Sequence, residues 1–86
     1  MSEPMNNETA LLGAAMMSAN VYSAAAADLA ADDFFFPRHG TIWQAMGRVV
    51  ARGGEPDPIA VCSELGALLP AAGGAPYVHS LPQLSP

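Results

Sequence analysis

Helix start and stop signals divide this chain into short segments, and they constrain its fold more than any other feature. Within the segments, apolar residues recur at steps of three and four, the spacing that one face of an α-helix requires. Pro37 suits the first position of a helix, and the pair Gly53-Gly54 suits its end. Asp57 and Pro58 then provide an N-cap and a first residue for the next helix. The pattern predicts an all-α domain of four or five short helices.

The expected helices are separated by caps and helix breakers. They run from about 7 to 19, from a cap at Ser18 or Asn20 to about Leu29, from Pro37 to about Arg52, from Asp57 to Pro70, and from Pro76 onward. The β-branched start of the fourth segment, at Ile59 and Val61, leaves a strand there as the alternative. We expect residues 1–6 to be flexible, residues 7–82 to form the helical domain and residues 83–86 to begin a linker.

One apolar stripe is predicted to form the centre of the core. It lies on the third expected helix and comprises Ile42, Ala45, Met46, Val49 and Val50, with Trp43 at its edge. The other helices are expected to contribute an inner face each. These faces comprise Leu12, Ala15 and Met16 in the first helix, Tyr22, Ala25, Ala26 and Leu29 in the second, Val61, Leu65 and Leu68 in the fourth, and Tyr77, Val78 and Leu81 in the last.

The charge balance argues against a nucleic-acid-binding surface. Eight carboxylates outnumber three arginines, there is no lysine, and the net charge is −5. Domains that bind nucleic acid usually carry a basic stripe that displaces counterions from the phosphates. We therefore expect little direct nucleic-acid binding.

The apolar stretch at residues 10–19 predicts neither a signal peptide nor a membrane span. No lysine or arginine precedes it, so the positively charged region of a signal peptide is missing. The stretch is also only about half as long as a transmembrane helix. The sequence predicts a soluble, cytoplasmic protein that makes no membrane contact.

No residue pattern typical of catalysis or cofactor binding is present. The chain has no G-x-x-x-x-G-K-[ST] phosphate loop, and His39 and His79 lie far apart. Cys62 is the sole cysteine, and its apolar neighbours favour a buried, inert thiol over a nucleophile. The adjacent Asp32 and Asp33 are explained by helix capping. We therefore expect no catalytic, cofactor-binding or metal site, and we do not expect the chain to be an enzyme.

His39 is the histidine with a predicted structural role. It falls in the first turn of the third expected helix, where a ring nitrogen is expected to cap the helix or pair locally. The alternative is a metal site assembled from His39, Cys62, His79 and a carboxylate, which the spacing of these residues does not support.

Three consecutive phenylalanines at residues 34–36 are either core residues or a surface that meets another protein. Full burial of one phenylalanine side chain is worth about 1.5–3 kcal/mol. A domain of this length, however, has little interior to hold three rings. The residues alone leave both interpretations open.

Four landmarks occur in a particular order along the chain. They are ETALLG at 8–13, DFFFPRHGTIWQAM at 33–46, an aspartate at 57 that opens a helix, and GGAPYVHSL at 73–81. Together they resemble the N-terminal domain of the DnaB family of replicative DNA helicases, over about residues 4–82. The residues that match the family pattern are Glu8, Leu12, Gly13, Asp33, Phe34, Pro37, His39, Ile42, Trp43, Asp57, Gly73, Gly74 and Tyr77.

The resemblance implies a compact, all-helical head of about five to six short helices. In such helicases the heads form a collar on a hexameric ring, where primase and in some systems a loader protein dock. The motor domain, which binds ATP and Mg²⁺, is not among these residues, so we expect no cofactor in this chain. Self-association is expected of the full-length hexamer. The resemblance thus implies a non-catalytic interaction domain of an ATP-dependent helicase, with the primase helicase-binding domain, a loader, or both as partners.

By the same resemblance, Phe34 takes the position of a buried phenylalanine of the family. It is expected to fill the core beside Leu29, Ile42 and Met46. This role accounts for the first of the three rings and leaves the other two to be explained.

Phe36 departs from the family, which commonly has a polar residue at this position. We favour a Phe36 ring that packs against Trp43 or Val21 as additional core. The alternative is an exposed patch of Tyr22, Phe35 and Phe36, the kind of aromatic anchor that dominates protein interfaces.

Two other functions stay open at this point. The chain could be the helicase-binding domain of a primase, a small helical bundle thought to share this fold, although the Asp-Phe-x-x-Pro-x-His pattern favours the helicase. It could also be a free-standing phage or plasmid protein that mimics the head and captures primase or loader. In either case Asp28, Asp32 and Glu55 would attract a basic partner, or they simply keep an alanine-rich domain soluble.

Overall fold

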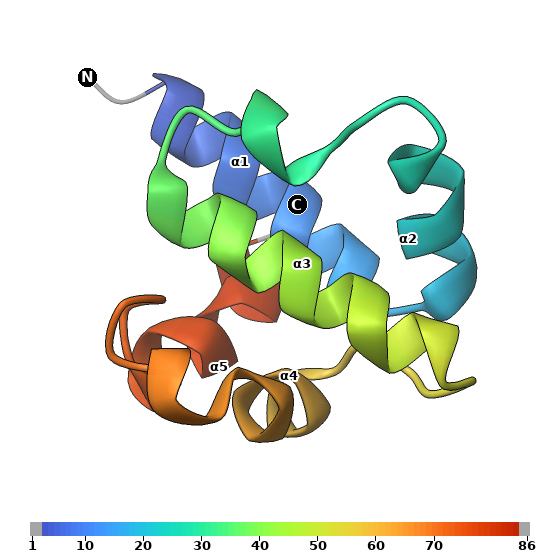
Figure 1. The fold of residues 1–86 in the computed structure, drawn as a ribbon. Helices are drawn as coiled ribbons and strands as arrows, with labels where there is room; N and C mark the ends of the chain where they lie inside the picture. The colour runs from blue at the N-terminus through green and yellow to red at the C-terminus, as the bar shows by residue number, and fades with distance from the viewer. Residues whose placement is uncertain (1–2, 85–86) are drawn as a thin grey trace.

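The computed structural model describes residues 3–84, and Figure 1 shows them as a bundle of short helices. The elements are α1 (Glu3–Met16), α2 (Ala19–Ala26), the 3₁₀ turn η1 (Ala31–Asp33), α3 (Pro37–Ala51), α4 (Pro58–Leu65), the 3₁₀ turn η2 (Gly66–Leu68) and α5 (Ala75–Leu84). No strand occurs among these described residues, so the predicted all-α class is confirmed. The segment at Ile59 and Val61, where a strand was the alternative, is helical.

α3 lies at the centre of the bundle and packs on α1 (Figure 1). α1 also packs against α2 and α5, and α4 packs against α3 and α5. The first and the last helix of the described chain therefore lie side by side, although they are far apart in sequence. This arrangement places residues from α1, α3 and α5 around one interior.

Two predicted N-caps and one predicted helix-opening proline are confirmed. The Ser18 Oγ atom accepts a hydrogen bond of 3.1 Å from the backbone N–H of Asn20 at the start of α2. The Asp57 Oδ1 atom accepts one of 2.8 Å from the backbone N–H of Ala60 at the start of α4. Pro37 is the first residue of α3, where its missing N–H costs nothing. These signals fix where three of the helices begin.

The predicted stop after α3 is also confirmed. Gly53 has a φ of +84°, a left-handed conformation that costs glycine little. Its N–H bonds to the Val50 carbonyl at 2.9 Å, and the Gly54 N–H bonds to the Val49 carbonyl at 3.0 Å. These bonds satisfy carbonyls that the helix end would otherwise leave unpaired.

The end of α4 differs from the prediction. The helix stops at Leu65, not at Pro70, because Gly66 takes a positive φ of +54° and redirects the chain into η2. Leu68, predicted on the inner face, is consequently half exposed. The predicted inner residues Val61 and Leu65 are buried.

The N-terminal boundary also differs from the prediction. α1 begins at Glu3, so residues 3–6, which were expected to be flexible, are helical. A tertiary contact explains the longer helix, because the Met5 Sδ atom lies 3.8 Å from the Tyr77 hydroxyl of α5. α1 ends at Met16, short of the expected residue 19, because Ser18 already caps the next helix. Residues 1–2 of the expected flexible segment lie outside the described residues.

At the other end, α5 continues through Pro82 to Leu84. Residues 83–84 are therefore part of the last helix and not the start of a linker. Residues 85–86 of the expected linker lie outside the described residues.

The core contains the stripe predicted on α3. Its buried apolar residues include Leu12, Ala15, Met16, Phe34, Ile42, Trp43, Ala45, Met46, Val61, Leu65, Ala72, Val78 and Leu81. Phe34 is 9% exposed and belongs to this cluster, as the prediction of a core ring requires. Leu29 is half-buried against the cluster. The helix faces set by sequence periodicity thus meet in one interior.

Candidate functional site at the Glu8–His39–Tyr77 cluster

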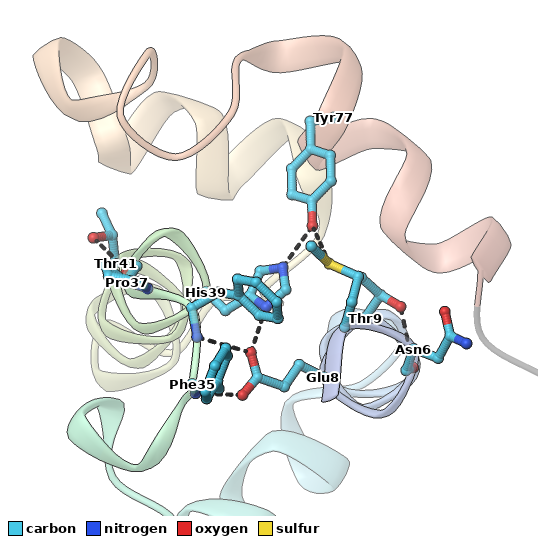
Figure 2. Close-up of polar contacts among 10 residues, drawn as sticks. Asn6, Glu8, Thr9, Phe35, Pro37, His39, Thr41 and Tyr77 are labelled. Atoms are coloured by element: carbon cyan, nitrogen blue, oxygen red, sulfur yellow. Dashed lines mark hydrogen bonds and ion pairs between the residues drawn. The ribbon is translucent and has the colours of Figure 1, made fainter. Parts of the chain in front are cut away.

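A buried histidine joins three helices near the N-terminal end of α3. His39 has no exposed surface. Its Nδ1 atom lies 2.6 Å from Glu8 Oε1 of α1, and its Nε2 atom lies 2.5 Å from the Tyr77 hydroxyl of α5 (Figure 2). The partners are 31 and 38 residues away in sequence. The expectation that His39 caps its helix or pairs locally is therefore wrong, because both ring nitrogens are used in long-range contacts.

Glu8 binds more than the imidazole. Its two carboxylate oxygens also accept hydrogen bonds from the backbone N–H groups of Phe35 and Phe36, the latter at 3.3 Å. Phe36 is the N-cap residue of α3, and its hydrocarbon side chain cannot cap a helix. A carboxylate from α1 thus fixes the backbone that leads into α3. Hydrogen bonds to a charged acceptor are about twice as strong as neutral ones, so the bonds from Phe35 and Phe36 to Glu8 hold this backbone firmly.

The donor and acceptor roles in the cluster follow from the carboxylate. An ionised carboxylate only accepts hydrogen bonds, so the His39 Nδ1–H donates to Glu8. When the imidazole is neutral, Nε2 is an acceptor and the Tyr77 hydroxyl donates to it. The hydroxyl also lies 3.8 Å from the Met5 Sδ atom. The resulting chain of contacts runs from α5 through α3 to α1.

Tyr77 is held from two other sides. The Arg38 guanidinium lies 5.6 Å from the centre of its ring, within the range of a cation–π contact. Burial raises the pKa of the Tyr77 phenol above its ordinary value, with Arg38 acting in the opposite direction. Gly73 packs against the same ring, and a Cβ at Gly73 would lie 2.7 Å from Tyr77 Cδ2. Gly73 and Gly74 both have positive φ, which explains glycine at both positions.

The geometry of this cluster is that of a structural connection between helices. His39 is enclosed, and the Glu8 side chain is only 14% exposed. Among the described residues, every buried side-chain nitrogen and oxygen has a hydrogen-bond partner. A general base or acid needs a free face toward a substrate, and the ring nitrogens of His39 are both taken up by protein groups.

A second aromatic cluster attaches α2 to α3. Tyr22 packs on Trp43 with ring centres 4.5 Å apart, and its hydroxyl donates to the Trp43 carbonyl at 3.4 Å. The Trp43 Nε1–H donates to the Leu29 carbonyl at 3.2 Å. The Tyr22 side chain can pack closely against α3 because Gly47 has no side chain. A Cβ at Gly47 would lie 2.6 Å from the Tyr22 hydroxyl oxygen. Burial raises the pKa of the Tyr22 phenol.

The three phenylalanines separate into three environments. Phe34 packs against Trp43 with ring centres 5.3 Å apart, whereas Phe35 is 72% exposed. Phe36 is half-buried and packs edge-on against His39, at 5.4 Å, and against Phe35, at 4.9 Å. The favoured prediction that Phe36 packs on Trp43 or Val21 is therefore wrong. An extended backbone before α3 directs the ring toward the histidine instead.

The predicted patch of Tyr22, Phe35 and Phe36 does not form. Tyr22 contacts the backbone beside Gly47, eleven residues after Phe36 along α3. That separation corresponds to about 16 Å of helix. Phe35 and Phe36 stay together as an aromatic pair.

The alternative metal site is not assembled. His39 is enclosed, His79 is exposed and Cys62 is half-buried. Within residues 3–84, no three histidine, cysteine or acidic side chains gather where they could hold a metal ion. Burial raises the pKa of the Cys62 thiol, which disfavours the thiolate. Asp33 of η1 accepts a hydrogen bond of 2.8 Å from the N–H of Ala30, the N-cap residue of this turn.

The other residues of the family pattern have structural roles in the core or at helix ends. Leu12, Gly13, Ile42 and Trp43 are buried, Pro37 opens α3, and Asp57 caps α4. The cluster of Glu8, His39 and Tyr77 was not predicted as a unit. The family pattern identified each residue separately. Glu8 and Tyr77 lie 31 and 38 residues from His39, and such long separations give no periodic signal that would group the three.

The fold and the cluster define a small all-helical domain whose main buried polar contacts connect its helices. A family model described as the DnaB-like helicase N terminal domain matches residues 1–86. The chain therefore belongs to the DnaB-like helicase N-terminal domain family.

Two similar proteins show how closely the chain matches this family. The chain is 33% identical over 76 residues to a protein of Mycobacterium leprae named replicative DNA helicase DnaB. That match covers 86% of this chain and 13% of the relative. The crystal structure of the N-terminal domain of DnaB helicase from Mycobacterium tuberculosis matches with a TM-score of 0.90 and 31% identity, over 95% of this chain and 61% of that one. The chain thus spans a small part of the curated relative that it matches.

None of the helices within residues 3–84 is both long enough and apolar enough to cross a bilayer.

Proposed function

We propose that this domain is a non-catalytic protein-interaction domain of a replicative DNA helicase. In this role it helps to organise the collar of a hexamer and docks primase or a helicase loader during cytoplasmic DNA replication. The observation that carries the proposal is the match to a solved DnaB N-terminal domain, at a TM-score of 0.90 over 95% of the chain. ATP and Mg²⁺ would be bound by a separate motor domain of the parent helicase.

The chemistry of the interior supports a binding role. His39, Glu8 and Tyr77 connect three helices, and both nitrogens of the buried imidazole are occupied. Some apolar side chains, by contrast, are exposed on the surface of the domain, among them Phe35 and Ile59. A rigid helical body with separate exposed apolar side chains suits recognition of another protein.

The charge supports a basic protein as partner. The chain has a net charge of −5. Arg48 and Arg52 both pair with Glu64, at 2.8 and 2.5 Å, which neutralises part of the little positive charge available. An acidic surface accelerates association with a basic protein and repels the phosphates of DNA.

Isothermal titration calorimetry with the C-terminal helicase-binding domain of the primase from the same organism tests this proposal. We expect weak binding whose affinity decreases between about 50 and 300 mM salt, because screening shortens the range of the attraction. A single-stranded oligonucleotide serves as the control and should not bind. If neither primase nor a loader binds, the docking role is wrong. Binding that does not change with salt would contradict electrostatic steering.

A further inference from the structure

A shallow groove of about 290 Å³ lies between η1 and the first half of α3. Its lining includes Asp32 on η1 and Phe34, Pro37, Gly40 and Thr41 on and before α3. η1 lies directly on the helix backbone at Gly40, where a Cβ would be 2.7 Å from the Ala31 carbonyl oxygen. The groove is therefore a fixed feature of the packing between these two elements.

The groove combines a mixed polar and apolar lining with a free charge. Pro37 and the small exposed part of Phe34 provide hydrocarbon surface. Asp32 is exposed, and within residues 3–84 its carboxylate has no hydrogen bond or ion pair, in contrast to Asp33, which binds the Ala30 N–H. A long side chain with an apolar stem and a cationic head complements both features.

The chain itself supplies little to fill this groove. Of its three arginines, Arg48 and Arg52 pair with Glu64, and Arg38 lies over the Tyr77 ring. There is no lysine. A second copy of this acidic chain would bring a net charge of −5 against another −5. Charge complementarity therefore favours a different, basic protein over a second copy.

We propose that this groove binds an arginine side chain of a basic protein partner. The guanidinium pairs with Asp32, and the arginine stem lies along Phe34 and Pro37. Arginine suits the site better than lysine because its planar, weakly hydrated head pairs with a carboxylate through two parallel hydrogen bonds. The inference deepens the docking role proposed above and rests on it.

The groove is tested without primase by NMR titration of the ¹⁵N-labelled 86-residue chain. The probes are two capped peptides, Ac-Leu-Arg-Leu-NH₂ and Ac-Leu-Gln-Leu-NH₂. We expect saturable shifts at the amides of Asp32, Gly40 and Thr41 with the arginine peptide only, and at least a fivefold loss of affinity in Asp32→Asn. Asp28→Asn, an exposed carboxylate outside the groove lining, is the matched control and should bind normally. Shifts spread over all acidic positions, or shifts equal for both peptides, would overturn the inference.

Calorimetry with the primase domain separates this inference from the proposed function. If primase binds the unaltered chain, we expect Asp32→Asn to weaken binding at least fivefold, while Asp28→Asn leaves it unchanged. Equal affinity for all variants would overturn the groove inference and leave the docking role intact. Peptide shifts at the groove without primase binding would instead contradict primase docking and retain an arginine-binding groove for another basic partner.

Discussion

The carboxylate of Glu8 and the imidazole of His39 meet at 2.6 Å across 31 residues of sequence, and this contact connects α1 to α3. The same carboxylate also accepts the backbone N–H groups that precede α3. One acidic side chain thus helps to position the central helix of the bundle.

Glu8→Ala should destabilise the domain by about 1–3 kcal/mol, because it leaves a buried imidazole donor unpaired. Urea unfolding followed by circular dichroism measures the change. Asp28→Ala is the matched control, since Asp28 is exposed, and it should change stability by less than about 0.5 kcal/mol. Equal effects of the two variants would show that the Glu8 contacts contribute nothing to stability.

Tyr77→Phe removes the hydroxyl that lies against the His39 Nε2 atom. We expect a loss of about 1–3 kcal/mol, because the buried ring nitrogen loses its partner. Tyr22→Phe removes a longer contact of 3.4 Å from a half-buried residue, so its loss should be smaller, about 0.5–1 kcal/mol. Denaturant midpoints of the two variants decide the order, and the reverse order would contradict the central role of the histidine cluster.

The three adjacent phenylalanines should respond to alanine substitution in three different ways. Phe34→Ala creates a cavity in the core and should cost about 3–5 kcal/mol, enough to unfold much of a small domain. Phe35→Ala should change stability by less than about 0.5 kcal/mol because the ring is exposed. Phe36→Ala should fall between them, since its ring covers His39. Thermal unfolding of the set measures the order, and a large loss in Phe35→Ala would show that this ring is not free.

Gly73→Ala should be destabilising by more than about 1 kcal/mol, because it combines a disfavoured positive φ with steric overlap. The added Cβ would lie 2.7 Å from the Tyr77 ring at a φ of +108°. Gly53→Ala has a similar φ of +84° but meets nothing within 4 Å. The difference between the two melting temperatures therefore isolates the contact with Tyr77. Indistinguishable melting temperatures would mean that Tyr77 moves aside without cost.

The free energy of unfolding should decrease at acidic pH, in part because Glu64 becomes protonated. Hydrogen bonds from Arg48 and Arg52 lower the pKa of this carboxyl below its ordinary value of 4.5. Because the pKa is lower in the folded state, the stabilising contribution is present above pH 4.5 and is lost as the pH falls through the lowered folded-state value. Glu64→Gln should flatten this part of the curve of melting temperature against pH. An unchanged slope below pH 4.5 would mean that the two exposed arginine contacts contribute nothing.

Local sequence signals were enough to place the helices and most of the core. Ser18, Pro37, Gly53 and Asp57 act within a few residues of their own position, so their effects follow from backbone chemistry alone. The periodic stripe on α3 likewise identified its buried face. The ends of α1, α4 and α5 were less predictable, since the Met5–Tyr77 contact and the positive φ of Gly66 have no unambiguous local signal.

Composition, periodicity and motif order were sufficient to predict an acidic, all-helical domain of the DnaB N-terminal type, because they are properties of the chain. The roles of His39 and Phe36 emerged only from the packing of the helices. Their partners lie on helices that meet through packing of α1, α3 and α5, and such contacts depend on distances that sequence spacing does not encode. The same packing separated Tyr22 from Phe35 and placed Asp32 at the groove between η1 and α3.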